Sequence, residues 1–142
     1  MFSLFNMGNS QISKVNFEDV QSIKATGLLI NTLPLHEQEC LITGTISATN
    51  EVKIINSYLS KNKNINLIIY GKNSNDETIY EKYKQLQKLG FVNVKLYIGG
   101  IFEWLLLQDI YGEEEFPTTK KQLDILKFKP NSSLSTSLIA IS

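Results

Sequence analysis

Residues 65–77, INLIIYGKNSNDE, carry the pattern that decides the fold of this protein. Five of the six residues from Ile65 to Tyr70 are large and apolar, which is typical of a central strand covered on both faces of a sheet. Gly71 ends this run, and a polar, turn-prone segment follows it. Apolar side chains then recur at helical spacing, at Ile79, Tyr83, Leu86 and Leu89. The stretch therefore predicts a buried strand, a tight loop and an amphipathic helix.

The predicted helix carries signals at both ends. Ser74 and Glu77 have the spacing of a capping box, in which the two side chains satisfy free backbone N–H groups of the first turn. Gly90 occupies the position where a glycine commonly ends a helix. We therefore expect the helix to be capped by Ser74 and to end at Gly90.

The same alternation of strand and helix patterns extends along the chain in both directions. Short apolar runs predict further strands, and segments of helical period lie between them. The predicted strands are 27–31, 41–46, 65–70 and 92–98, and the predicted helices are 17–24, 50–61, 74–89 and 101–110. This order indicates βαβ units, and therefore an α/β fold built on a parallel sheet.

Composition and charge exclude several classes of function. The chain has 142 residues, enough for one domain, and its 14 cationic and 14 acidic side chains give a formal net charge of zero. All the cations are lysines, so no planar guanidinium is present to hold a phosphate bidentately. The sequence has no excess of basic side chains that would bind nucleic acid, and we therefore expect no nucleic-acid partner.

The metal-ligating and membrane-spanning residue types are also scarce. A single cysteine, Cys40, excludes a disulfide within the chain, and one histidine beside it makes a metal site or a cofactor unexpected. No apolar run approaches the ~18 residues that span a bilayer, so we expect no membrane insertion. The first residues lack the basic region of a signal peptide. We therefore expect a cytoplasmic protein, with translation starting at Met1 or at Met7.

The chain divides into three parts by residue composition and hydrophobic pattern. Residues 1–11 read as an N-terminal tail, residues 12–112 as the domain, and residues 113–142 as a C-terminal extension. The extension begins with an acidic run, continues with a helical pattern at 120–128, and becomes loop-like from Pro130. We therefore expect the extension to be partly helical and then flexible.

Several short motifs, spread in order over about 100 residues, resemble the rhodanese domain. The most specific is Leu-Gly-Phe-Val-Asn-Val at 89–94, followed by Gly99-Gly100 and by Trp104. Weaker matches precede them, at 29–31, 37–40, 42–46 and 68–71. The resemblance implies a single domain with a five-stranded, mostly parallel sheet flanked by helices on both faces. It also places Trp104 on the helix that packs behind the active site, as an anchor of the core.

The active members of this family transfer sulfur with a cysteine that begins a six-residue loop, and an arginine commonly closes that loop. The resemblance places Gly71 at the cysteine position and Asp76 at the arginine position. A persulfide needs a sulfur nucleophile, which glycine cannot supply. Asn31 and Leu33 also replace residues usual in the family. The resemblance therefore implies a rhodanese scaffold without sulfur transfer.

Three functions are compatible with these residues. The leading hypothesis is a catalytically inactive module with a protein-binding or regulatory role. The second is a sulfurtransferase or other thiol-dependent enzyme that uses Cys40, with His36 four residues earlier on the same helix face. The third is a binder of a small neutral ligand, held by the loop amides and by Asn73 and Asn75. The candidate ligand loop consists of Gly71, Lys72, Asn73, Ser74, Asn75 and Asp76.

Overall fold

A computed structural model describes residues 12–134, which form a five-stranded sheet. The strand order is β1-β5-β4-β2-β3, and every neighbouring pair is parallel. The prediction of an α/β fold with a five-stranded parallel sheet is therefore confirmed, and β4 lies at the centre. The strands are β1 (Ser13–Val15), β2 (Gly27–Asn31), β3 (Thr45–Ile46), β4 (Asn66–Tyr70) and β5 (Val94–Tyr97).

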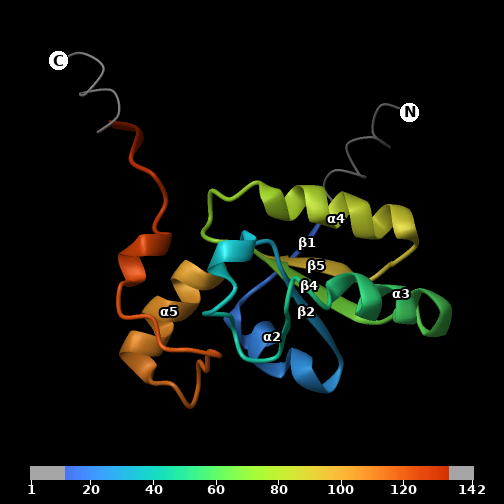
Figure 1. Cartoon of the computed structure of the whole chain (residues 1–142), viewed down its shortest axis with the longest axis horizontal. Helices are drawn as coiled ribbons and strands as arrows, with labels where there is room; N and C mark the ends of the chain where they lie inside the picture. The colour runs from blue at the N-terminus through green and yellow to red at the C-terminus, as the bar shows by residue number, and fades with distance from the viewer. Residues whose placement is uncertain (1–11, 135–142) are drawn as a thin grey trace.

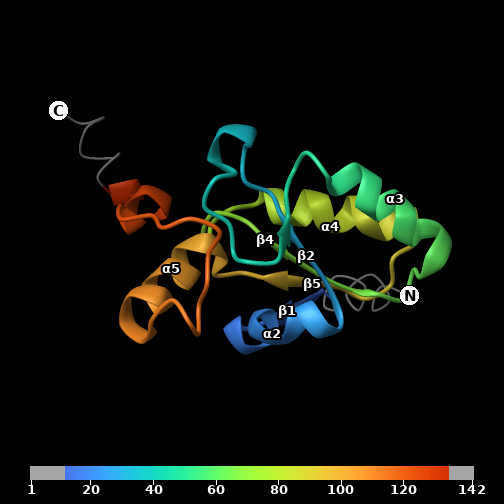
Figure 2. The same cartoon turned by 60° about the horizontal axis from the view of Figure 1, so that its bottom comes forward.

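Helices cover both faces of this sheet (Figures 1 and 2). Helices α3 and α4 pack on one face, and α2 and α5 pack on the other. The α-helices are α2 (Phe17–Ser22), α3 (Glu51–Lys61), α4 (Thr78–Leu89) and α5 (Gly100–Tyr111). Three short 3₁₀ turns complete the description, η1 (Ile23–Ala25), η2 (Leu35–Glu37) and η3 (Ile125–Phe128). Among residues 12–134, no helix is long and apolar enough to cross a bilayer.

Strand β4 contributes to the cores on both faces of the sheet. Leu67 and Ile69 belong to the core under α3 and α4, whereas Ile68 and Tyr70 belong to the core under α2 and α5. Each of the four side chains is at most 2% exposed. This alternation follows from the two-residue period of a strand, and it explains why the apolar run is nearly continuous.

Trp104 anchors the second of these cores, as predicted. Its side chain is 1% exposed, and its ring makes edge-to-face contacts with Tyr97 and Phe116. The indole N–H donates a hydrogen bond of 3.1 Å to the carbonyl oxygen of Pro117. The core therefore includes residues that follow the end of α5.

Residues 116–131, which we call the C-terminal segment, lie against α5 and against the end of the sheet (Figure 2). Thr118 forms an isolated antiparallel bridge with Ile42. The bridge is extended by a bond of 3.0 Å from the Thr43 N–H to the Pro117 carbonyl, and by one of 2.8 Å from the Thr119 N–H to the Leu41 carbonyl. Main-chain groups used in this way cannot form a helix.

The predicted helix at 120–128 is wrong, because this stretch contains only the 3₁₀ turn η3. Phe128, at the end of this turn, is 1% exposed and packs in the same core as Trp104. Phe116 and Phe128 therefore extend the packed core beyond residue 112, where the domain was predicted to end. The predicted N-terminal tail, both candidate start methionines and the end of the extension lie outside the described residues.

Candidate functional site

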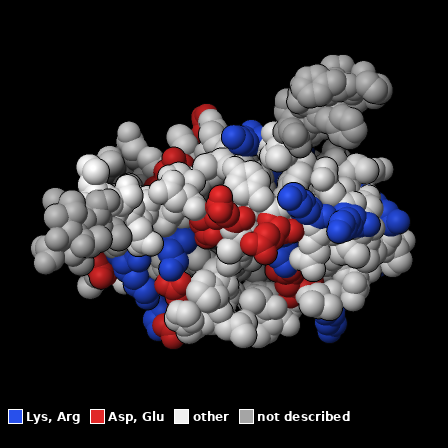
Figure 3. All heavy atoms as spheres, turned by 90° about the horizontal axis from the view of Figure 1, so that it is seen from above, with Lys and Arg blue, Asp and Glu red and all other residues white. Residues whose placement is uncertain are grey.

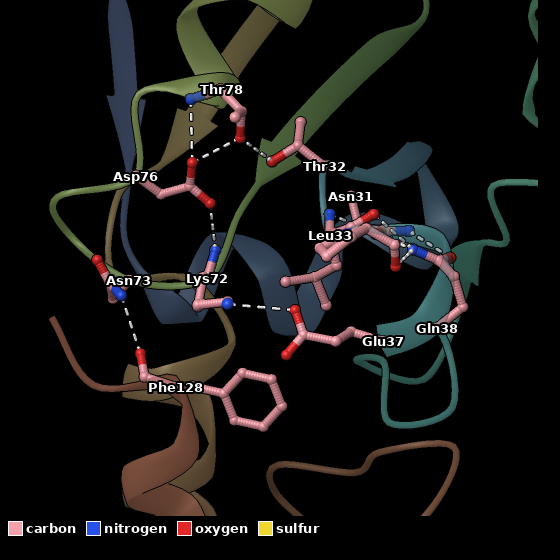
Figure 4. A network of polar contacts seen from close by, with 11 residues as sticks. Asn31, Thr32, Leu33, Glu37, Gln38, Lys72, Asn73, Asp76, Thr78 and Phe128 are labelled. Carbon is pink, nitrogen blue, oxygen red and sulfur yellow. Dashed lines mark hydrogen bonds and ion pairs between the residues drawn. The ribbon is translucent and has the colours of Figure 1, made fainter. Parts of the chain in front are cut away.

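The candidate site lies at the carboxyl ends of β2 and β4, where loops of an open parallel sheet commonly bind ligands. Gly71 directly follows β4, and the loop continues to Glu77 before α4 begins at Thr78. We call residues 71–77 the β4–α4 loop. Thr32 follows the neighbouring strand β2 and faces this loop (Figure 4). The structure therefore brings the predicted loop residues together at one edge of the sheet.

Asp76 occupies the interior of the loop (Figure 4). Its Oδ2 accepts a hydrogen bond of 2.8 Å from the backbone N–H of Lys72. Its Oδ1 accepts bonds from the backbone N–H and the hydroxyl of Thr78, at 3.0 and 2.6 Å. The carboxylate therefore takes backbone donors at both ends of the loop, as a bound anion would.

This carboxylate fills the space beside Gly71 where a side chain would otherwise project. A Cβ atom built on Gly71 would lie 2.8 Å from Asp76 Cγ, and closer still to Asp76 Oδ2. It would also lie 2.9 Å from the hydroxyl oxygen of Thr32. Contacts this short require the neighbouring atoms to move, so the loop in this conformation accepts only a glycine at position 71.

The predicted capping box is wrong. Helix α4 begins at Thr78 instead of near Ser74, and its N-cap residue Glu77 makes no capping hydrogen bond through its side chain. Asp76 accepts from the Thr78 N–H and takes over this role. Ser74 is exposed. The spacing of Ser74 and Glu77 resembles a helix start, but both residues lie in the loop that precedes α4.

Asn73 joins the loop to the C-terminal segment (Figure 4). Its side-chain Nδ2 donates a hydrogen bond of 2.9 Å to the carbonyl oxygen of Phe128, and its Oδ1 accepts one of 2.9 Å from the Asn75 N–H. The side chain is buried, and its donor and acceptor atoms both have partners. One hydrogen of the Asn73 amide is therefore used within the protein, and the role of Asn73 as a donor to a neutral ligand stays a prediction.

Helix α5 also packs closely against the loop. The N–H groups of Ile101 and Phe102 each donate a bond of 3.0 Å, to the carbonyls of Gly71 and Lys72. Gly100 has a φ of +67°, and a Cβ atom there would lie 2.6 Å from the Gly71 carbonyl oxygen. Gly100 therefore permits an approach that a residue with a side chain would prevent.

Lys72 and Glu37 form an ion pair below the loop (Figure 4). The Nζ–Oε1 distance is 3.2 Å, the Glu37 side chain is 7% exposed, and that of Lys72 is 35% exposed. Glu37 Oε1 has no partner with hydrogen-bond geometry among the described residues, so the attraction is Coulombic. Sequence reasoning missed this pair, because the two residues are far apart in sequence and only the fold brings them together.

Asn31 and Gln38 form a second polar contact, which the sequence analysis also missed. Asn31 is buried, and its Oδ1 accepts bonds from the Leu33 N–H at 2.9 Å and from Gln38 Nε2 at 2.8 Å. These bonds fix the turn that follows β2. The position of Asn31 at the carboxyl end of a predicted strand was the available signal.

Cys40 lies away from the loop, under the C-terminal segment. It is buried, and desolvation raises the pKa of its thiol above the ordinary value, an effect that a hydrogen bond to Thr118 and the charge of Lys127 only partly offset. The predicted helix shared by His36 and Cys40 is absent, because the turn η2 ends at Glu37. Both residues line a small cavity of about 100 Å³, without a hydrogen bond between them among the described contacts.

Raising the thiol pKa decreases the fraction of reactive thiolate at neutral pH. The hydrogen-bond partner of the thiol is Thr118, whose hydroxyl is not a base at neutral pH. Within residues 12–134, no group of three His, Cys, Asp or Glu side chains is placed to hold a metal ion.

Two solved structures are similar to this chain in fold. One is the crystal structure of the Alr3790 protein from Anabaena sp., with 17% identity, a TM-score of 0.54, and coverage of 89% of this chain and 91% of that one. The other is the solution structure of the rhodanese-like domain of the same Anabaena protein, with 18% identity, a TM-score of 0.52, and coverage of 84% and 86%.

A search of curated proteins finds no match. The family model described as the rhodanese-like domain matches residues 20–107, from α2 to α5. This range covers more than half of the chain, and it contains the strands of the central sheet except β1 as well as the whole β4–α4 loop. The chain therefore belongs to the rhodanese-like domain family.

Proposed function

We propose that this chain is a rhodanese-like module that does not transfer sulfur and that acts by binding a protein partner. The observation that carries the proposal is the position of the Asp76 carboxylate. It lies where the side chain of residue 71 would project, and it accepts the Lys72 N–H. The loop thus holds the Asp76 carboxylate at the place where an active member of the family would hold its nucleophile.

The chemistry of sulfur transfer supports the first half of this proposal. A persulfide forms only on a sulfur nucleophile, and glycine has none. A thiosulfate anion approaching the loop would meet the negative charge of Asp76 and find the Lys72 N–H already occupied. Cys40 is a poor substitute, because burial raises its thiol pKa and the C-terminal segment covers it.

A groove beside the loop supports the second half. A depression of about 600 Å³ lies between the end of β2 and the starts of α3 and α4. Val52, which is 70% exposed, lines it together with Glu51, Glu81 and Lys82. On the face that carries α4, acidic side chains gather near the middle, and lysines lie toward both ends of the view (Figure 3). We propose that the partner binds in this depression, with Val52 at the centre of the contact and the charged side chains at its rim.

A thiosulfate-to-cyanide assay tests the absence of sulfur transfer. We expect no thiocyanate from the wild type, from Cys40→Ser or from Gly71→Cys, because the new Cβ would collide with Asp76. The double variant Gly71→Cys/Asp76→Ala removes that obstacle, and we expect activity only there. Thiocyanate production by the wild type, lost in Cys40→Ser, would overturn the proposal.

Affinity capture with the full chain tests partner binding. Val52→Glu places a charge in the groove, and Leu123→Glu makes the same kind of change at a side chain that is 84% exposed in the C-terminal segment. We expect a protein that the wild type and Leu123→Glu retain and that Val52→Glu does not. Equal retention by all three would show that the groove is not the binding surface. The cytoplasmic location stays a prediction, which fractionation of the source cells can check.

A further inference from the structure

A second cavity, of about 410 Å³, lies between the β4–α4 loop and the C-terminal segment. Lys72 and Asp76 contribute to its wall from the loop, and Lys127 and Lys129 contribute from the C-terminal segment. The family model ends at residue 107, so two of the three lysines come from outside the matched region. The cavity therefore depends on a part of the chain that the family does not define.

The charges that face this cavity are unequal. Lys72 is paired with Glu37, whereas neither Lys127 nor Lys129 lies within ion-pair distance of a carboxylate among residues 12–134. Asp76 is the only carboxylate in the wall, and hydrogen bonds within the loop take up both of its oxygens. With the Lys72–Glu37 pair counted as neutral and Asp76 as one negative charge, Lys127 and Lys129 leave the wall with a net positive charge.

Two side-chain amides add neutral donors to this wall. Asn75 and Asn131 both line the cavity, and neither side-chain amide group bonds to another described residue. A volume of about 410 Å³ lies within the range of about 300–1,000 Å³ typical of small-molecule sites. The site is therefore large enough for a ligand that contacts the loop and the C-terminal segment together.

We propose that this cavity binds a small polyanion, a molecule that carries at least two carboxylate or phosphate groups. A single oxyanion has no cradle here, because Asp76 occupies the Lys72 N–H. A ligand with two anionic groups reaches lysines on both sides of the cavity, where ammonium groups act as point charges. The cavity adjoins the protein-binding groove and shares Thr32 and Thr78 with it, but none of the three cavity lysines lines the groove.

Binding of this kind joins the C-terminal segment to the rest of the domain. Lys127 also lines the smaller cavity that contains Cys40, so the segment that supplies the lysines covers the thiol. A ligand held between Lys72 and the two segment lysines stabilises the closed arrangement. Cys40 is the one cysteine in the sequence, and its labelling therefore reports how often the segment opens.

The experiment measures the rate of maleimide labelling of Cys40 in the full chain. Citrate, inorganic phosphate and acetate are added in turn at constant ionic strength, and the melting temperature is recorded in parallel. We expect citrate at ten times its dissociation constant to slow labelling about tenfold, because a ligand that binds only the closed state lowers the open population by that ratio. Acetate, with one charge, leaves the rate unchanged.

Two charge-matched variants decide the assignment. Lys127→Gln/Lys129→Gln removes the cavity lysines, whereas Lys84→Gln/Lys88→Gln removes two exposed lysines of α4. We expect the effect of citrate to disappear only in the first variant. Inorganic phosphate is a single oxyanion and should leave the rate unchanged, as acetate does; slowing by phosphate as strong as that by citrate would overturn the requirement for two anionic groups. Pyrophosphate, tested beside citrate, shows whether the site accepts phosphate-bearing ligands or polycarboxylates alone. An identical labelling rate in citrate and sodium chloride, or an equal loss in both variants, overturns the proposal.

Discussion

Asp76 accepts three hydrogen bonds, from the Lys72 N–H, the Thr78 N–H and the Thr78 hydroxyl. Two of these donors are backbone groups whose only hydrogen-bond acceptor among the described residues is this carboxylate. Hydrogen bonds to a charged acceptor contribute more to stability than bonds between neutral groups, and an unpaired donor is costly where water cannot reach it. Asp76 therefore matters for the stability of the loop as well as for its charge.

Replacing Asp76 tests this role. We expect Asp76→Ala to lower the free energy of unfolding by about 1–3 kcal/mol, because the Lys72 and Thr78 N–H groups lose their acceptor. Urea denaturation followed by circular dichroism measures the change. Asp109→Ala, at an exposed position of α5, is the control and should shift stability by less than about 0.5 kcal/mol. Equal effects of the two substitutions would show that the carboxylate is not needed for the loop.

The residue scale also shows what the sequence could and could not predict about the site. The run of apolar residues before Gly71 correctly located the loop at the end of β4. The charge of Asp76 was evident from the sequence, but the direction of its side chain was not, because the direction depends on backbone donors that only the folded loop brings together. The pairing of Lys72 with Glu37 was missed for the same reason.

Helix α5 and the β4–α4 loop meet at Gly100, which has a left-handed φ of +67°. An alanine there would place its Cβ atom 2.6 Å from the Gly71 carbonyl oxygen, in addition to the backbone strain. We expect Gly100→Ala to destabilise the protein by about 1–3 kcal/mol. Gly90→Ala is the control, since Gly90 is left-handed with a φ of +112° and a Cβ atom there would meet only the flexible Lys63 side chain, at 3.3 Å. Urea denaturation gives the free energy of unfolding of both variants, and the difference between them separates the steric collision from the backbone strain. Equal losses of stability would contradict a role for the close approach of Gly100 to the loop.

The C-terminal segment depends on the turn η3 in a similar way. Phe128 is 1% exposed, whereas Leu126, two residues earlier, is 61% exposed. We expect Phe128→Ala to cost about 3–5 kcal/mol through loss of burial and creation of a cavity, and Leu126→Ala to cost less than about 0.5 kcal/mol. Thermal unfolding measures both. A small effect of Phe128→Ala would mean that the segment does not contribute to the stability of the domain.

The sequence predicted which helices and strands are present better than it predicted the residues at which they begin and end. The predicted strand 27–31 matches β2, and the predicted strand 65–70 starts one residue before β4. The start of α4 was wrong because Ser74 and Glu77 satisfy a helix pattern while Asp76 is the residue that contacts Thr78. The pattern at 120–128 predicted a helix, but the preceding residues pair with 41–43, and a pairing so distant in sequence leaves no local signal.

On the scale of the whole molecule, one core contains one thiol and two phenol side chains, which are neutral at pH 7 and become negatively charged when they lose a proton at high pH. Cys40, Tyr70 and Tyr97 all belong to the core under α2 and α5. Burial raises the pKa of each one, and the carboxylate of Glu103, which accepts the hydroxyl proton of Tyr97 in a hydrogen bond of 2.5 Å, raises the pKa of Tyr97 further. Their protonated forms are therefore favoured by folding.

The sign of the resulting pH dependence follows from proton linkage. Above about pH 9 for cysteine and pH 10 for tyrosine, the unfolded chain releases these protons while the folded chain keeps them. The stability contributed by the three groups is thus fully present below these pH values and is lost as the pH rises toward the folded pKa values. Each group that differs in protonation between the two states contributes a slope of about 1.4 kcal/mol per pH unit.

Urea denaturation at pH 8, 9, 10 and 11 measures this slope. We expect the free energy of unfolding to fall increasingly steeply above pH 9, and Tyr97→Phe to reduce the slope because one of the three protons no longer takes part. Tyr111→Phe, which alters a side chain that is 65% exposed, should leave the slope as in the wild type. The slope is a better readout than the stability itself, because Tyr97→Phe also removes a hydrogen bond at every pH. A stability that stays constant up to pH 11, or an unchanged slope in Tyr97→Phe, would show that the buried hydroxyl is not held in its protonated form by the fold.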